Sequence, residues 1–85
     1  MVFTMEKFTT FEKAMAYFDC ANHYFDAIQN LNIDVRIKHE IIRSEYIWTC
    51  NKITELDYSK ITDDEFNSIS DAYEQFRTHY HKICK

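Results

Sequence analysis

Histidine and cysteine are the side chains of this sequence best suited to binding a metal ion. The chain has three cysteines and four histidines, and His81 and Cys84 are three positions apart, so they share one face of a helix. The spacings typical of zinc and di-iron sites, Cys-x-x-Cys, His-Glu-x-x-His and Glu-x-x-His, do not occur. The sequence therefore predicts neither a bound metal nor another cofactor.

Cys20 and His23 lie near one face of a predicted helix, beside Asp19, and suggest nucleophilic catalysis. A histidine within hydrogen-bond reach of a thiol activates it as a nucleophile. However, Cys20 also borders the apolar stripe of that helix, where a free cysteine is usually a small packing residue. Phosphate-binding loops need glycine, and the chain has none. We expect a protein that is not an enzyme. A small helical enzyme or metal protein is the third of three hypotheses, after the two given below.

Acidic side chains recur every seven residues in two rows. On a helix, seven residues span about 10 Å, and carboxylates at such intervals could imitate a phosphate backbone and occupy a basic cleft. A solvated helix face produces the same pattern, and the net charge of −4 is modest for a nucleic-acid mimic. The two rows consist of Glu12, Asp19 and Asp26, and of Asp57, Asp64 and Asp71.

All of these side chains must be positioned by helices, because the chain lacks both proline and glycine. Apolar residues recur three and four positions apart in three stretches, which predict helices at residues 10–29, 34–56 and 63–84. Thr9 with Glu12 and Thr62 with Glu65 match the capping box, and Asp34 is placed to cap the middle helix. We expect Asn30 or Asn32 to end the first helix in the left-handed conformation.

Three such helices joined by short connections predict an all-α fold, a single three-helix up-down-up bundle with an aromatic-rich core that forms one domain over residues 1–85. Ala14 and Ala21 leave room for a close neighbour on the first helix, and Tyr17 and Tyr24 widen its apolar stripe. The residues expected in the core are Phe18, Phe25, Ile42, Phe66, Tyr73 and Phe76.

The segment 34–56 carries two apolar surfaces, and we take it as the element around which the others are arranged. A surface helix needs only one apolar stripe, so a second stripe predicts a further partner. The competing interpretation is that residues 1–8 fold back, with Phe3 and Phe8 covering Trp48. The first stripe consists of Val35, Ile42, Tyr46, Ile53 and Leu56, with His39 and Thr49 along it. The second strip is Ile37, Ile41 and Trp48, separated from the first by a charged ridge of Lys38, Glu45 and Lys52.

Composition narrows the classes of partner. A net charge of −4 disfavours direct nucleic-acid binding, and no apolar run approaches the roughly 20 residues that a membrane helix requires. Three widely spaced cysteines fit a reducing, cytoplasmic environment. We therefore predict a non-enzymatic interaction module or small regulator that binds a protein partner, or a second copy of itself, through Ile37, Ile41 and Trp48. Of these two, we expect self-association into a homo-oligomer.

The alternative is a small inhibitor of the type that phages and mobile elements encode, of the anti-CRISPR or anti-restriction class. Such a protein would use the two acidic rows as a nucleic-acid mimic. Binding through apolar surface should survive high salt, whereas binding through carboxylates should weaken as ionic strength rises.

Overall fold

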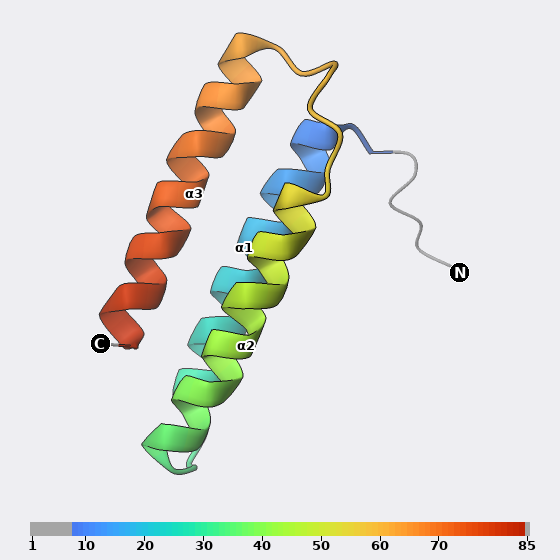
Figure 1. The fold of residues 1–85 in the computed structure, drawn as a ribbon. Helices are drawn as coiled ribbons and strands as arrows, with labels where there is room; N and C mark the ends of the chain where they lie inside the picture. Colours follow the sequence, from blue (N-terminus) through green and yellow to red (C-terminus); the bar gives the residue numbers. More distant parts are fainter. Residues whose placement is uncertain (1–7, 85) are drawn as a thin grey trace.

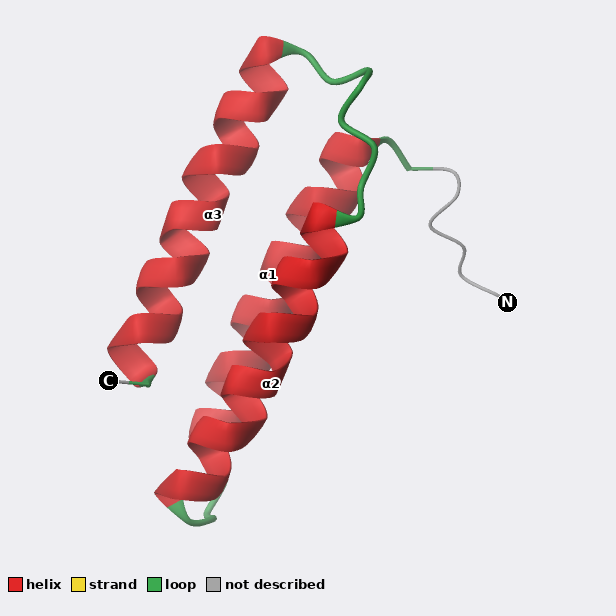
Figure 2. Ribbon diagram, in the orientation of Figure 1, coloured by secondary structure: helices red, strands yellow, loops and turns green. Residues whose placement is uncertain are grey.

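The computed structural model describes residues 8–84, which form three α-helices and, within that range, no strand (Figures 1 and 2). The helices are α1 (Thr10–Gln29), α2 (Val35–Thr54) and α3 (Asp63–Ile83). Successive helices run in opposite directions, which confirms the predicted all-α, up-down-up three-helix bundle. The predicted helix bounds agree with the observed ones to within two residues at every end.

The helix starts follow the local capping signals. At α1, the Thr9 hydroxyl accepts a hydrogen bond from the Glu12 amide at 3.1 Å, and the Glu12 carboxylate accepts one from the Thr9 amide at 3.0 Å. Thr62 and Glu65 form the same reciprocal pair at α3. Both predicted capping boxes are confirmed, and each satisfies two amides that would otherwise lack a partner.

The predicted end of α1 is wrong in one respect, because no described residue has a positive φ. Asn30 keeps a right-handed conformation with φ of −84°, and its amide donates to the Asp26 carbonyl at 3.3 Å. The next amide, that of Leu31, donates to the Ile28 carbonyl. The last turn of α1 therefore tightens instead of reversing its hand. The chain then enters α2 through Asp34, whose carboxylate accepts a hydrogen bond from the Arg36 amide at 2.8 Å.

The central helix of the bundle is α1, and the prediction that segment 34–56 holds this position is wrong. α1 packs along both α2 and α3, whereas α2 and α3 touch each other much less. Small side chains explain this arrangement, because Ala14 and Ala21 are fully buried and let both neighbours approach the α1 backbone closely. The buried residues of α1 are Ala14, Phe18, Ala21, Phe25 and Ile28.

The core is built around an aromatic cluster, defined as Phe18, Phe25, Tyr46, Phe76 and Tyr80. Phe76 is its centre, with ring centroids 5.4 Å from Phe18, 5.6 Å from Phe25 and 5.0 Å from Tyr46. Tyr46 and Tyr80 stack at 4.0 Å with an interplanar angle of 11°. The cluster joins all three helices, which confirms that the bundle has an aromatic-rich core.

Two residues that were predicted to be packed, Phe66 in the core and Val35 in the first apolar stripe, are exposed. Phe66 is 55% exposed and Val35 is 60% exposed. Both lie in the first turn of their helices, and the helices are staggered along their length (Figure 1). At one end of the bundle, the start of α3 projects past the start of α1 and the end of α2. At the other end, the start of α2 extends beyond the end of α3. Neither first turn therefore has a full set of neighbours. Tyr73, also predicted in the core, is half-buried at its edge.

Thr49 has no exposed surface, and within residues 8–84 its hydroxyl has no hydrogen-bond partner. A buried, unsatisfied polar group costs roughly 1–3 kcal/mol. Because valine has nearly the same shape, Thr49→Val is expected to raise the free energy of unfolding by about 1 kcal/mol, measured by urea unfolding followed by circular dichroism. Thr49→Ser is the control, since it keeps the hydroxyl and removes the methyl group, and it should lower stability. A loss of stability in Thr49→Val would contradict the unsatisfied hydroxyl.

Candidate functional site

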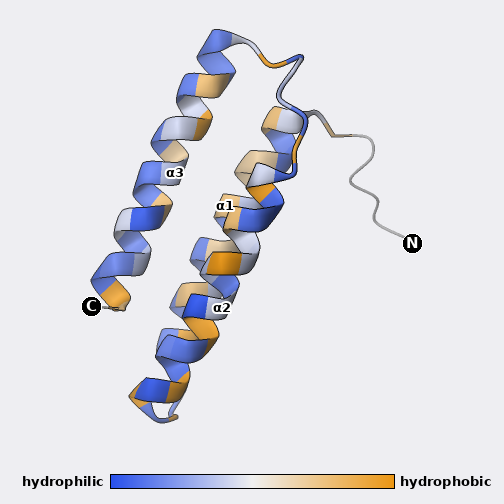
Figure 3. Ribbon diagram, viewed as in Figure 1, coloured by the Kyte–Doolittle hydropathy of each residue, from blue (hydrophilic) through white to orange (hydrophobic). Residues whose placement is uncertain are grey.

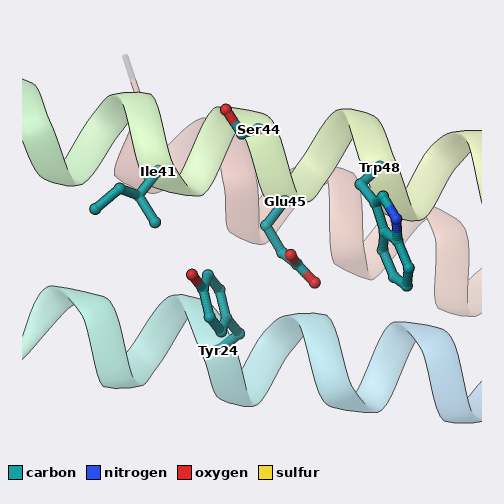
Figure 4. A pocket seen from close by; sticks show the side chains of 5 residues that line it. All are labelled: Tyr24, Ile41, Ser44, Glu45 and Trp48. Carbon is teal, nitrogen blue, oxygen red and sulfur yellow. The ribbon is translucent and has the colours of Figure 1, made fainter.

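An apolar groove runs between α1 and α2 on the face that points away from α3 (Figure 4). We call it the α1–α2 groove. One part has a volume of about 440 Å³, and an adjoining part has a volume of about 640 Å³. Both parts share Glu45 and Trp48. The first part is lined in addition by Tyr24, Ile41 and Ser44, and the second by Phe8, Phe11, Glu12, Met15, Ala16, Tyr17 and Cys20.

The groove contains two of the three residues predicted to bind a partner. Trp48 is 48% exposed and its ring meets the ring of Tyr17 edge-on, with centroids 5.7 Å apart. Ile41 is half-buried and also packs against the core. Ile37 is 51% exposed and lies one helical turn before Ile41, outside the residues that line the two parts. The strip is therefore continuous with the groove but not wholly inside it.

Sequence reasoning missed the wall that α1 contributes. Tyr17 and Tyr24 were predicted to widen the core stripe. Tyr17 does pack against the core and also lines the groove, whereas Tyr24 is 40% exposed and lines the groove alone. Cys20 was expected to be a packing residue, and it is exposed at the groove instead. The seven-residue repeat of Tyr17 and Tyr24 beside an already complete stripe is the signal that a second apolar face exists on this helix.

Glu45 was predicted to lie on a charged ridge, and the structure directs it into the groove. Its carboxylate points toward α1 between Tyr24 and Trp48 (Figure 4). The residue is half-buried, and burial raises the pKa of the Glu45 carboxyl above its usual value. Within residues 8–84 it forms no ion pair with a lysine, arginine or histidine. It is an acidic group in an apolar groove, and no cation among residues 8–84 neutralises it.

The two lysines of the same ridge are engaged elsewhere. Lys38 donates to the main-chain carbonyl of Gln29 at 2.7 Å, which ties the start of α2 to the end of α1. Lys52 Nζ lies 3.6 Å from the Glu55 carboxylate and 5.7 Å from the centroid of the Trp48 ring. Lys52 thus borders the groove at the tryptophan, and neither lysine compensates Glu45.

In the competing interpretation, residues 1–8 cover the second strip. Of these residues, the structure describes only Phe8. Phe8 is half-buried and lines the larger part of the groove together with Trp48. Phe3 and the rest of residues 1–7 lie outside the described residues. Phe8 therefore forms part of one wall, and the strip beyond it, at Ile37 and Ile41, has no described N-terminal residue among those lining the groove.

The acidic rows are exposed throughout, but they do not form two regular lines of free carboxylates. Glu12 is used in the capping box, and Asp26 lies 3.2 Å from the Nε2 atom of His79. Asp57 is not on α3 but in the preceding loop, where it accepts a hydrogen bond from the Ser59 amide at 3.0 Å, which lowers the pKa of Asp57. The second row therefore has two members on α3, and its first member lies in the loop before that helix. The members that do lie on helices are Glu12, Asp19, Asp26, Asp64 and Asp71.

The histidines and cysteines are spread over the molecule. His23 and Asp19 approach to 3.9 Å on a solvent-exposed surface, while the Cys84 thiol lies 3.8 Å from the main-chain carbonyl of His39. Burial raises the pKa of the Cys50 and Cys84 thiols. In the part of the chain that is described, no three histidine, cysteine or acidic side chains converge on a common point where a metal ion would be held.

Comparison with protein-family models, curated proteins and solved structures gives no match to this chain.

Among residues 8–84, no helix combines the length and the apolar composition needed to cross a membrane. Hydrophobic positions concentrate on α1 and α2, while the outer surface of α3 is mainly hydrophilic (Figure 3). The function must therefore be inferred from the groove itself.

Proposed function

We propose that this protein is a non-enzymatic binding module and that its α1–α2 groove binds a protein partner. The observation that carries the proposal is the position of Trp48, which is half-exposed in an apolar groove and lies outside the aromatic cluster of the core. Exposed apolar patches commonly mark interaction sites, and tryptophan is enriched among the residues that dominate binding energy.

The location of the groove supports this proposal. α2 buries Ile42, Thr49 and Ile53 in the core, so it has a complete core-facing stripe besides the groove face. Trp48 and Ile37 remain half-exposed although a helix of this bundle needs only one apolar face. An apolar surface that the fold does not require is consistent with selection for binding.

The proposal is tested with the double variant Ile37→Glu with Trp48→Ala, used as bait in a pull-down from the native host. We prefer Ile37 to Ile41 for the charged substitution because Ile41 also packs against the core. The variant should keep its helical circular dichroism and cooperative melting but lose the proteins that the parent captures. Ile47→Glu, an exposed isoleucine elsewhere on α2, is the matched control and should retain them.

Two outcomes would contradict this function. One is that the double variant captures the same proteins as the parent. The other is that capture weakens as ionic strength rises and is lost in Asp64→Asn with Asp71→Asn, which would favour the acidic-mimic inhibitor instead. If the double variant unfolds, Trp48→Ala alone provides the same comparison with a smaller change to the helix.

A further inference from the structure

The α1–α2 groove is elongated. Its lining runs along α1 from Phe11 to Tyr24, a separation of 13 positions, which corresponds to about 20 Å at 1.5 Å per residue. The two parts join at Glu45 and Trp48 rather than forming one enclosed chamber. This shape matches a rod-like occupant of three to four helical turns better than a compact small molecule.

The lining has a definite chemical pattern along its length. Aromatic and aliphatic side chains line both parts, and the Glu45 carboxylate lies where the parts meet. A partly buried carboxylate costs free energy unless a cation or hydrogen-bond donors compensate it. The lysines nearest in sequence, Lys38 and Lys52, already contact Gln29 and Glu55. An occupant that supplies a cation at this point removes that cost, while its apolar side chains fill both parts of the groove.

We infer that the partner element is an amphipathic α-helix of a different protein, which lies in the α1–α2 groove and places a lysine or arginine against Glu45. This inference rests on the proposed function. The partner helix packs against α1 and α2 on the side opposite α3, so that α1 becomes covered on three sides. Apolar residues three and four positions apart on the partner contact Ile41 and Trp48 (Figure 4), and also Tyr17.

Electrostatics disfavours a second copy of this chain as the occupant. In a two-fold contact centred on the junction of the two parts, the Glu45 carboxylates of both copies would meet in an apolar environment, and like charges there are costly. The chain also carries a net charge of −4, so two copies repel each other at long range. A basic helix is attracted by the same charges, which favours a different protein.

The test is a selection of helical peptides against the full chain, using a displayed library with an apolar i, i+3, i+4, i+7 pattern and randomised polar positions. The chain has a single tryptophan, so the fluorescence of Trp48 reports directly on occupation of the groove by tryptophan-free peptides. Selected peptides should shift the Trp48 emission to shorter wavelength. They should also share lysine or arginine at one position of the pattern.

A selected peptide and its twin, in which norleucine replaces the basic residue, are then compared on three proteins. The parent should bind the basic peptide about tenfold more tightly than the norleucine twin, the order expected for one charge-assisted contact. Glu45→Gln should lose that preference while still binding both peptides. Glu40→Gln, which removes an exposed carboxylate of α2 outside the groove, is the matched control and should keep the preference.

Several results would overturn the inference. Peptides that shift Trp48 without a basic preference would refute the occupant's chemistry but leave the proposed function intact. Concentration-dependent dimers in sedimentation, abolished by Ile37→Glu with Trp48→Ala, would identify a second copy as the occupant. A red shift of Trp48 emission on removal of residues 1–7 would identify the chain's own N-terminus. If no peptide binds and the double variant still captures every partner of the parent, both the inference and the proposed function fail.

Discussion

Phe76→Ala is expected to lower the free energy of unfolding by about 3–5 kcal/mol. Phe76 is fully buried, and its ring contacts Phe18 and Phe25 on α1 and Tyr46 on α2. Its removal leaves a cavity at a point where all three helices meet. A domain of this size has a total stability of about 5–8 kcal/mol, so the variant should be close to unfolded at room temperature.

Phe66→Ala is the matched control, because it makes the same chemical change on the same helix at a side chain that is 55% exposed. We expect its free energy of unfolding to stay within about 1 kcal/mol of the parent value. Urea unfolding followed by circular dichroism measures both variants. Equal losses in the two would show that the start of α3 is packed as tightly as its middle and would contradict the staggered arrangement of the helices.

The helices and their starts were predictable because they depend on short-range chemistry. The capping boxes at Thr9 and Thr62 involve residues only three apart, and the absence of proline leaves each apolar stripe uninterrupted. The end of α1 was harder, because an asparagine near a helix end is compatible with both hands of the backbone. Asn30 keeps the right-handed one, since its amide can still reach the Asp26 carbonyl.

Periodicity could not predict which helix is central or how far the helices are shifted along one another. A stripe shows which face of a helix is apolar but not how far the helix slides along its neighbour. Phe66 and Val35 complete their stripes, yet the stagger leaves both more than half exposed. Likewise, Asp57 continues a seven-residue repeat in sequence although it lies in a loop, six residues before α3 begins.

The α1–α2 groove was predictable on one wall only. A second apolar strip on α2 identified Trp48 and Ile41, because two strips on one helix exceed what a bundle needs. The other wall depends on which side of α1 is covered by α3, and that choice is made by packing. Tyr24 lines the groove, and Tyr17 lines it while also packing against the core. Glu45 looked like part of a solvated ridge because its neighbours at seven-residue spacing are lysines.

The second large effect is expected at Tyr46, which provides the main aromatic contact between α2 and α3. Its ring stacks on Tyr80 at 4.0 Å and on Phe76 at 5.0 Å, and burial raises the pKa of its hydroxyl above the usual value. Because α2 and α3 touch so little elsewhere, Tyr46→Ala should lower the free energy of unfolding by about 2–4 kcal/mol. Tyr46→Phe keeps the stacked ring and should cost no more than about 1 kcal/mol.

A double-mutant cycle shows whether the stacking itself holds α3 against α2. Tyr46→Ala, Tyr80→Ala and the double variant are unfolded in urea, and the coupling free energy is calculated from the four proteins. Direct stacking predicts a coupling of about 0.5–1.5 kcal/mol beyond the loss of buried area. Strict additivity would instead mean that the two rings act independently, with Tyr46 holding α2 against α3 through its other stacked contact, that with Phe76.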